Sequence, residues 1–287
     1  GECSVVNCSF NGNYANSYGG AMYYGSAVNC TFTNNSAYSG GVLYNGSAVN
    51  CSFNGNNASN FGGVLYVGSA VNCTFINNSA SYGGVVYGSA VVNCTFTNNS
   101  ASGSGGVMNG GSAVNCTFTN NNAHTSGGVV YGSAVVNCTF INNSADYGGA
   151  VFGEEYYTAS GCIFTGNSAR YGGAISGEGY TAKDCIFTGN SACNGGAISG
   201  ECSAVNCNFT NNNASEYGGA MYGGTAKDCI FKGNTAGIDG NSTYGTDLPK
   251  SVLTVSNYSS TYGSGGKLII NFTTLSGNPI DDANITI

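Results

Sequence analysis

The sequence feature that most constrains this chain is an internal repeat. The motif Asn-Cys-Thr-Phe, followed by Asn-Asn-Ser-Ala and then by a pair of glycines, recurs with small changes along most of the sequence. Steps of 21 to 24 residues separate the repeat's cysteines, which are Cys8, Cys30, Cys51, Cys73, Cys94, Cys116, Cys138, Cys162, Cys185, Cys207 and Cys229. A period of this length indicates a solenoid in which each repeat forms one coil. The eleven copies are therefore eleven samples of one structural environment.

Two positions in each copy predict corners of the coil. The residue before the cysteine is Asn, Gly or Asp, and the residue four positions after the cysteine is Asn or Gly. These residue types adopt a left-handed backbone at low cost. Between the two corners, Cys and Phe alternate with variable residues, which is the period of a strand. We therefore expect Cys and Phe to face the core.

Three short strands in each coil predict the fold class. Two further columns, those of Ala27 and Leu43, are apolar in the coils compared, while the positions beside them vary. Strands joined at corners and stacked in register form an all-β, right-handed parallel β-helix of about eleven coils. Its core columns are those of Ala27, Cys30, Phe32 and Leu43. The column of Asn35 is expected inside as a ladder of hydrogen-bonded amides.

The repeat and its end define three expected segments. Residues 1–240 form the β-helix, residues 241–250 form a linker that contains Pro249, and residues 251–287 begin an Ig-like β-sandwich with alternating strands. The last segment is too short to close a two-sheet core, and no cap covers the first coil. We therefore expect this chain to be part of a longer protein.

Charge is scarce. Only 7% of the residues are charged, the net charge is −7, and no Asp, Glu, Lys or Arg lies between Cys3 and Ala145. His124 is the one conventional acid or base in that stretch. Six basic residues give no cationic face, so we exclude nucleic acid as a partner. The sequence has neither a membrane-spanning apolar run nor a signal-peptide start, so membrane or wall anchoring is expected only through parts outside this chain.

The fourteen cysteines allow three interpretations. Eleven of them occupy one inward column, which favours free thiols packed as small apolar side chains. Rungs ~4.8 Å apart also lie within the Cα range of disulfides, so some pairs could form. A metal site is disfavoured because C-x2-C spacings are absent, and no cofactor is expected. Cys3, Cys193 and Cys202 lie outside the column and are the better candidates for pairing.

The second half of the chain carries the acidic residues. Glu154, Glu178 and Glu201 follow a glycine at the same position of three consecutive coils, so they are expected to stack on one edge. They could form a retaining glycosidase pair, a weak Ca²⁺ site or a solvated turn. Asn-x-Ser/Thr motifs such as those of Asn34 and Asn57 are expected by chance in an Asn- and Ser-rich chain, although a turn position such as Asn34 would be accessible to glycosylation after export.

Two outward aromatic columns flank the glycine pair. They contain Tyr18, Phe61, Tyr82, Tyr147, Tyr171 and Tyr217 before it, and Tyr23, Tyr44, Tyr66, Tyr87, Tyr131, Phe152 and Tyr222 after it. Neighbouring aromatic rings stabilise a sheet by covering each other. They also suit a sugar face or a partner protein. The contact hypothesis centres on Tyr82, Tyr87, Tyr147 and Phe152 and extends to Tyr18, Tyr23, Tyr217 and Tyr222.

Two motifs carry a family resemblance. Phe-x-x-Asn paired with Gly-Gly-Ala-Val or Gly-Gly-Ala-Ile, as at residues 148–151, 172–175 and 195–198, resembles the repeats of chlamydial polymorphic membrane proteins. The Asn-Cys-Thr-Phe-x-Asn-Asn-Ser-Ala form is similar to adhesin-like surface proteins of methanogenic archaea, and residues 277–287 are similar to bacterial-type Ig-like modules. The resemblance covers nearly the whole chain. It implies a secreted cell-surface stalk and carries over no catalytic residue.

The sequence is therefore compatible with four candidate functions. The first is a non-catalytic, extracellular adhesin whose partners are glycans or proteins of host or neighbouring cells. A polysaccharide-active enzyme, a lyase or glycosidase, shares the fold, but its acids would have to lie between Glu154 and Glu201. Ice binding would use outward pairs such as Thr31 and Thr33, which other coils interrupt. The fourth is a purely structural cell-wall component.

Overall fold

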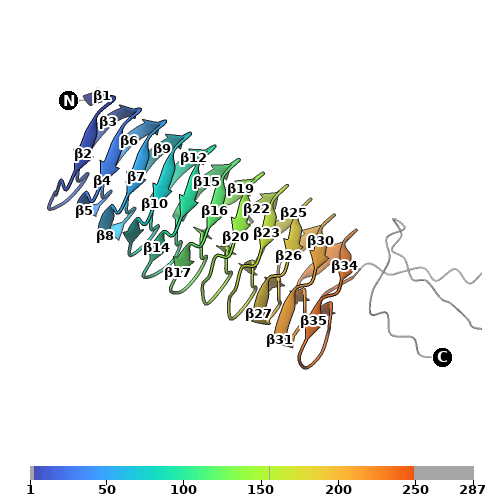
Figure 1. Ribbon diagram of the computed structural model, residues 1–287. Helices are drawn as coiled ribbons and strands as arrows, with labels where there is room; N and C mark the ends of the chain where they lie inside the picture. The colour runs from blue at the N-terminus through green and yellow to red at the C-terminus, as the bar shows by residue number, and fades with distance from the viewer. Residues whose placement is uncertain (1–2, 155, 249–287) are drawn as a thin grey trace, which may run out of the picture.

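The computed structural model describes residues 3–154 and 156–248, and these residues form a parallel β-solenoid of about eleven turns (Figure 1). All regular structure in this described part is β-strand. The coils follow one another along a rod, with the N-terminal strand β1 at one end and β34 to β36 at the other. The predicted Ig-like segment, residues 251–287, lies outside the described residues.

Each coil contributes to three parallel sheets, which we call sheets A, B and C. Sheet A contains β1 Cys3–Val6, β3 Met22–Val28, β6 Leu43–Val49, β9 Leu65–Val71, β12 Val86–Val92, β15 Met108–Val114, β18 Val130–Tyr131, β19 Ala134–Val136, β21 Val151–Gly153, β22 Thr158–Ser160, β24 Ile175–Gly177, β25 Thr181–Lys183, β28 Ile198–Ser199, β29 Ser203–Val205, β32 Met221–Tyr222, β33 Thr225–Lys227 and β36 Thr243–Tyr244. Sheet B contains β2 Ser9–Asn11, β4 Thr31–Thr33, β7 Ser52–Asn54, β10 Thr74–Ile76, β13 Thr95–Thr97, β16 Thr117–Thr119, β20 Thr139–Ile141, β23 Ile163–Thr165, β26 Ile186–Thr188, β30 Asn208–Thr210 and β34 Ile230–Lys232. Sheet C contains β5 Ser36–Ser39, β8 Asn57–Phe61, β11 Ser79–Ala80, β14 Ser100–Ala101 and β17 Asn122–Ala123, and then β27 Ser191–Asn194, β31 Asn213–Tyr217 and β35 Thr235–Ala236.

The corners lie where the sequence predicted them. Asn29 and Asn34, on either side of β4, have φ angles of 53° and 54°, and Gly161 and Asp184 have φ angles of 62° and 54° at the corner before the cysteine. Asn, Asp and Gly enter this left-handed region at low cost, which is why only these types occur there. The corners make each coil three-sided and keep successive coils in register.

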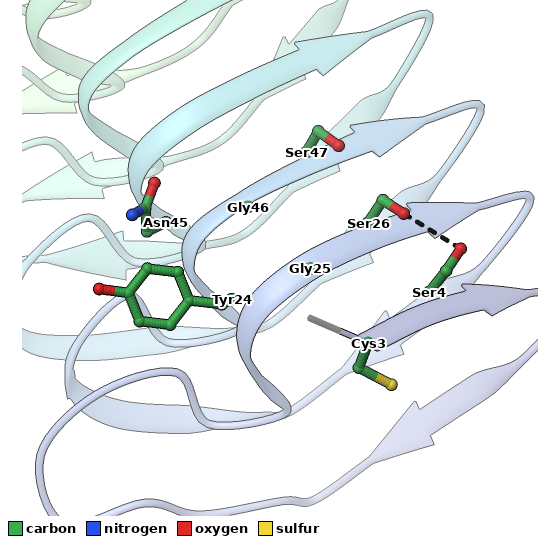
Figure 2. A pocket seen from close by; sticks show the side chains of 8 residues that line it. All are labelled: Cys3, Ser4, Tyr24, Gly25, Ser26, Asn45, Gly46 and Ser47. Atoms are coloured by element: carbon green, nitrogen blue, oxygen red, sulfur yellow. Dashed lines mark hydrogen bonds between the residues drawn. The ribbon is translucent and has the colours of Figure 1, made fainter. Parts of the chain in front are cut away.

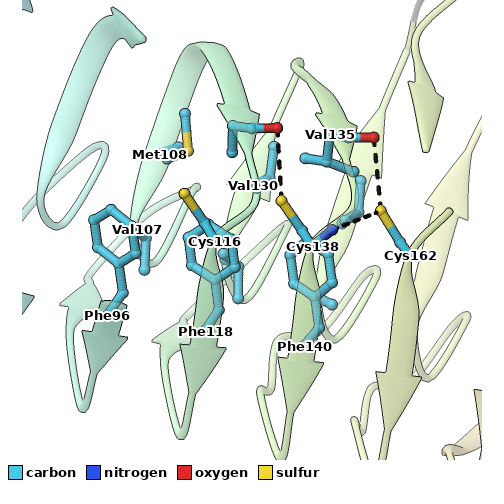
Figure 3. Close-up of a cluster of buried hydrophobic side chains, with 14 of the residues drawn as sticks. Phe96, Val107, Met108, Cys116, Phe118, Val130, Val135, Cys138, Phe140 and Cys162 are labelled. Carbon is cyan, nitrogen blue, oxygen red and sulfur yellow. Dashed lines mark hydrogen bonds between the residues drawn. The ribbon is translucent and has the colours of Figure 1, made fainter. Parts of the chain in front are cut away.

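The core is a set of stacked columns. The phenylalanines of the Phe32 column are fully buried from Phe32 to Phe209. Neighbouring rings in this column lie nearly parallel, with centroids 4.7 to 5.0 Å apart. Figure 3 shows three of these rings, Phe96, Phe118 and Phe140, beside the cysteine column. Ala27 and Leu43 are also buried, at 0% and 1% exposure. The four predicted core columns are therefore confirmed.

The cysteines are free thiols, all fourteen of them. In the column, the Cys94 thiol donates to the Val92 carbonyl at 3.2 Å and accepts the Cys73 backbone N–H at 3.4 Å. A neutral thiol fills both roles, so the expectation of buried thiols is confirmed. The suggested pairing among the cysteines outside the column is wrong, because Cys3, Cys193 and Cys202 are free thiols as well. Cys3 lies beside Gly25 in the first rung, whereas Cys202 lies many coils away beside Gly224.

The asparagine column forms the predicted ladder. The Asn78 side chain donates from Nδ2 to Asn99 Oδ1 at 3.0 Å and to the Phe53 carbonyl at 3.1 Å, and its backbone N–H donates to the same Asn99 oxygen at 2.9 Å. The pattern continues from Asn13 to Asn234. Every buried amide in this column is thus hydrogen-bonded on both sides.

Strand pairing continues past residue 240. Thr243 and Tyr244 of β36 pair with Met221 and Tyr222, and Asp247 forms a bridge with Thr225. These residues fall in the segment that the sequence assigned to a linker. Backbone pairing needs no particular side chains, so strands can continue after the sequence motif has faded. The predicted end of the solenoid at residue 240 is therefore too early.

Candidate binding surface

The two outward aromatic columns meet where sheet C passes into sheet A. In the column after the glycine pair, the rings of Tyr44 and Tyr66 are parallel at 5.1 Å, and those of Tyr66 and Tyr87 are parallel at 5.3 Å. Rings also touch across the two columns, with Phe61 and Tyr87 4.6 Å apart. The columns therefore form one surface, which we call the aromatic strip.

The strip is divided into three patches. The first patch contains Tyr18, Tyr23, Tyr44, Phe61, Tyr66, Tyr82 and Tyr87, the second Tyr131, Tyr147, Phe152 and Tyr171, and the third Tyr217, Tyr222 and Tyr244. Between the first two patches, Ser104 and Ser126 occupy the column before the glycine pair, and Asn109 occupies the column after it. Ser176 and Ser199 follow Phe152 in the column that continues toward the third patch.

All eight predicted contact residues lie at the surface. Tyr18, Tyr23, Tyr82, Tyr147 and Tyr222 are exposed, and Tyr87, Phe152 and Tyr217 are half-buried. The structure groups them by patch instead of bringing all eight together.

One ring of the first patch, Tyr24, was not predicted from the sequence. Tyr24 is 40% exposed, and its ring meets Tyr23 edge-on at 4.6 Å. It occupies a left-handed corner that is Asn45 and Val67 in the next two coils, so no column pattern marked it.

A depression lies beside the second patch. Its lining includes the rings of Tyr147, Phe152 and Tyr171, the carboxylates of Glu154 and Glu178, and the small residues Ser126, Ser176, Gly177, Ser199 and Gly200. Ser176 and Ser199 continue the column of Tyr131 and Phe152, which the sequence predicted to face outward, but they are only 5% and 4% exposed. A serine is too short to reach past the flanking rings, so the missing aromatic rings leave a hollow.

The acidic groups shape the chemistry of this depression. The Tyr131 hydroxyl donates to Glu154 Oε2 at 3.4 Å, and burial, together with the Glu154 charge, raises the pKa of Tyr131. Arg170 lies over the Tyr171 ring at 5.3 Å but does not line the depression. Carboxylates beside aromatic rings accept hydrogen bonds from hydroxyl groups and repel anions.

The acidic edge is less regular than the sequence suggested. Glu154 and Glu178 share the depression, whereas Glu201 does not line it. Within residues 3–154 and 156–248, no group of three or more His, Cys, Asp and Glu side chains could hold a metal ion. The suggested calcium site therefore has no ligand set in this part of the chain.

A second depression lies near the N-terminal end of sheet A (Figure 2). It is lined by Cys3, Ser4, Tyr24, Gly25, Ser26, Asn45, Gly46 and Ser47. Ser26 donates a hydrogen bond to Ser4 at 3.1 Å across its wall. Its lining is made of neutral small and polar groups with a single aromatic ring, so it offers less contact area to a ligand than the strip does.

Seven segments of the chain match the Chlamydia polymorphic membrane protein repeat: residues 29–46, 72–89, 93–107, 115–133, 137–154, 161–178 and 184–201. The repeats are similar to those of surface-type proteins. Each match begins at the left-handed corner before a column cysteine and runs through the sides of sheets B and C and the glycine pair; six of the seven continue into the next strand of sheet A. The matched units therefore contain the whole of the second aromatic patch.

Comparisons with curated proteins and with solved structures identify no relative of this chain. In the part of the chain that the structure describes, no helix is long and apolar enough to cross a membrane. The repeat similarity and the β-solenoid together support a repeat-rich protein of the surface type.

Proposed function

We propose that this chain is the rod of an extracellular, cell-surface adhesin or stalk that does no catalysis and attaches to glycans or proteins of host or neighbouring cells. The observation that carries the proposal is the aromatic strip, in which exposed and half-buried surface rings contact one another from coil to coil. A contiguous exposed apolar surface on a protein usually marks a contact site. The similarity to Chlamydia polymorphic membrane protein repeats supports the surface location.

The chemistry of the strip favours neutral glycans among these partners. A tyrosine ring packs on the apolar face of a sugar, and its hydroxyl group hydrogen-bonds to the sugar's edge. Glu154 and Glu178 add acceptors to the second patch and disfavour anionic sugars. Each patch would bind weakly, and three patches on one rod, with many rods on one cell, would raise the overall strength.

Replacing Tyr82, Tyr87, Tyr147 and Phe152 by Ser tests the proposal. These residues belong to two patches and do not belong to the buried Phe column, so the rod is expected to stay folded. We expect attachment to cells or to immobilised neutral glycans to fall by at least tenfold at both low and high salt, because few charges take part. The matched control replaces Thr33, Thr97, Thr119 and Thr165, which lie on sheet B, by Ser.

The outcomes separate the explanations. Unchanged attachment by a folded quadruple variant contradicts the proposal and leaves the rings a role in sheet stability alone. Attachment that collapses with added salt points instead to the acidic edge from Glu154 to Glu201.

A polysaccharide-active enzyme is the second candidate because two carboxylates line a depression beside aromatic rings. Glu154→Gln and Glu178→Gln would abolish the release of new sugar ends by such an enzyme while sparing binding. If the unaltered chain releases no ends from polysaccharides that it binds, this candidate fails. A purely structural wall component would bind none of them.

A further inference from the structure

Sheet B is bordered by a row of equivalent surface motifs, of a type that is expected by chance in an Asn- and Ser-rich chain. In seven consecutive coils, the corner asparagine begins an Asn-Cys-Ser or Asn-Cys-Thr triplet, at Asn7, Asn29, Asn50, Asn72, Asn93, Asn115 and Asn137. All seven have left-handed φ angles and are exposed, while the cysteine between Asn and the hydroxyl residue points inward. The triplet places both the amide and the hydroxyl on the outer surface.

The asparagine amides in this row are available. None of the seven side chains makes a hydrogen bond to a described residue, in contrast to the buried ladder of Asn35 one corner away. The hydroxyl residues that follow, such as Thr31, Thr74 and Thr95, are exposed as well. Asn-x-Ser/Thr is the acceptor motif for asparagine-linked glycans.

The backbone alone does not explain the pairing of Asn with Ser or Thr. The corner needs a left-handed residue, which Gly161, Asp184 and Asp228 supply equally well. The outward strand position accepts Thr or Ile, since both are β-branched. Yet in the three coils where the corner is not Asn, the position two residues on is Ile163, Ile186 or Ile230.

The remaining coil fits no acceptor motif, because Asn206 is followed by Asn208. Seven of the eight corner asparagines therefore have the hydroxyl, and none of the three other corners does. A requirement for both groups at once explains this pattern.

We propose that this row is a set of asparagine-linked glycosylation sites. The side-chain nitrogen would form a bond to the anomeric carbon of a glycan carried on a lipid phosphate. The bond from that carbon to the phosphate oxygen breaks, the phosphate leaves with the lipid, and the amide proton passes to solvent. The inference rests on the surface location in the proposed function, because asparagine glycosylation occurs on exported chains.

The geometry also predicts where the glycans lie and how many fit. Sheet B is the side of the three-sided coil opposite the junction of sheets C and A, so glycans on its corner leave the aromatic strip free. Adjacent sites are only ~4.8 Å apart along the rod. Branched glycans are wider than this, so we expect adjacent coils not to be occupied together and about three or four of the seven sites to be filled.

The test secretes the chain through a host that attaches asparagine-linked glycans. Treatment with peptide-N-glycosidase in heavy-oxygen water converts each occupied Asn to a labelled Asp, which peptide mass spectrometry locates. We expect labels within the row from Asn7 to Asn137. A variant with Thr74, Thr95, Thr117 and Thr139 replaced by Val keeps the corner asparagines and should lose the labels in those four coils.

A second variant, which gains a site, makes the test independent of whether the Thr-to-Val variant folds. Gly161→Asn combined with Ile163→Thr builds the triplet in a coil that lacks it, and this residue pair already exists in five other coils. We expect a new label at position 161, in chains whose adjacent Asn137 is unoccupied. A secreted, folded chain without labels in the row overturns the inference, whether or not Asn213, an acceptor motif elsewhere, is labelled.

The glycosylation test and the binding test fail separately. The host exports the chain regardless of its natural location, so absence of labels says nothing about the strip. Loss of attachment in the Tyr82, Tyr87, Tyr147 and Phe152 variant says nothing about the corner asparagines.

Discussion

At the scale of single residues, the buried asparagine ladder shows how a polar column can stay inside a narrow core. From Asn35 to Asn212, each Asn Oδ1 in the ladder accepts two hydrogen bonds from the preceding coil, and each Nδ2 donates two. The backbone conformation of the corner does not require Asn in this column, because the left-handed residue is the one before it in each coil. The ladder instead links each coil to the next from within.

Replacing Asn99 by Ala should therefore destabilise the coils on both sides. The change removes Asn99 Oδ1, the shared acceptor of the backbone N–H and Nδ2 of Asn78, and it also removes Asn99 Nδ2, one of the two donors to Asn121 Oδ1. Each unsatisfied buried group costs about 1–3 kcal/mol, so we expect a loss of about 3 kcal/mol or more. Hydrogen exchange of the amides in the neighbouring coils measures it. The exposed Ser100→Ala, one residue on, is the control and should change little.

The thiols give a second prediction at this scale. Burial raises the pKa of Cys202 to about 12, above the ordinary value of 9.0. Because the folded state favours the neutral thiol, this stabilising contribution is complete below pH 9 and is lost as the pH rises from 9 toward 12. At about 1.4 kcal/mol per pH unit, Cys202 alone accounts for at most about 4 kcal/mol.

Denaturant unfolding at pH 7.5 and pH 10.5 should therefore show lower stability at the higher pH, and Cys202→Ala should reduce the difference. Alkylation of the native chain at pH 8 should label Cys3, Cys8 and Cys193, which are exposed or half-buried, and leave the buried column cysteines from Cys30 to Cys229 unlabelled. Rapid labelling of Cys94 or Cys116 in the folded rod would contradict this account.

At the scale of the coil, the glycine pair sets the closest approach of the backbone. A Cβ on Gly127 would lie 2.1 Å from the Val130 carbonyl oxygen, whereas a Cβ on Gly189 would meet nothing within 4 Å. Both glycines have a φ of 62°, so the two substitutions by Ala carry the same left-handed strain of about 1 kcal/mol.

Any further loss of stability in Gly127→Ala therefore measures the steric contact. We expect this variant to fold poorly or to unfold at least 10 °C lower than Gly189→Ala, as followed by circular dichroism. Equal melting of the two variants would show that the coil relaxes around the added methyl group. Gly189→Asn should be nearly neutral, because other coils carry Asn34 or Asn98 at this corner.

The same coil geometry explains what the sequence could and could not predict. Corners, core columns and the Asn35 ladder were predictable because each depends only on positions within one repeat. The burial of Ser176 and Ser199 was not, since it depends on the size of side chains in the adjoining column and coils. The extra pairing of β36 was missed because it relies on backbone groups after the motif has faded.

At the scale of the whole rod, stability is expected to be nearly a sum over coils and their interfaces, so complete coils can be removed. Deleting residues 94–115 removes one period of 22 residues, the step from Cys94 to Cys116, and joins Asn93 to Cys116. The deleted coil contributes Ser104 and Asn109 to the aromatic strip and no ring. Its removal brings the coil of Tyr87 next to the coil of Tyr131.

A coil deletion can therefore separate the length of the rod from the continuity of its aromatic strip. The rod that lacks residues 94–115 should stay folded and attach to glycans at least as well as the full chain, because its first two patches become continuous. Deleting residues 73–93 shortens the rod by one coil as well but removes Tyr82 and Tyr87, so we expect its attachment to fall severalfold. Surface-binding measurements on the two rods, with circular dichroism to verify folding, decide the matter. If both deletions weaken attachment equally, the length of the rod governs binding and the strip does not.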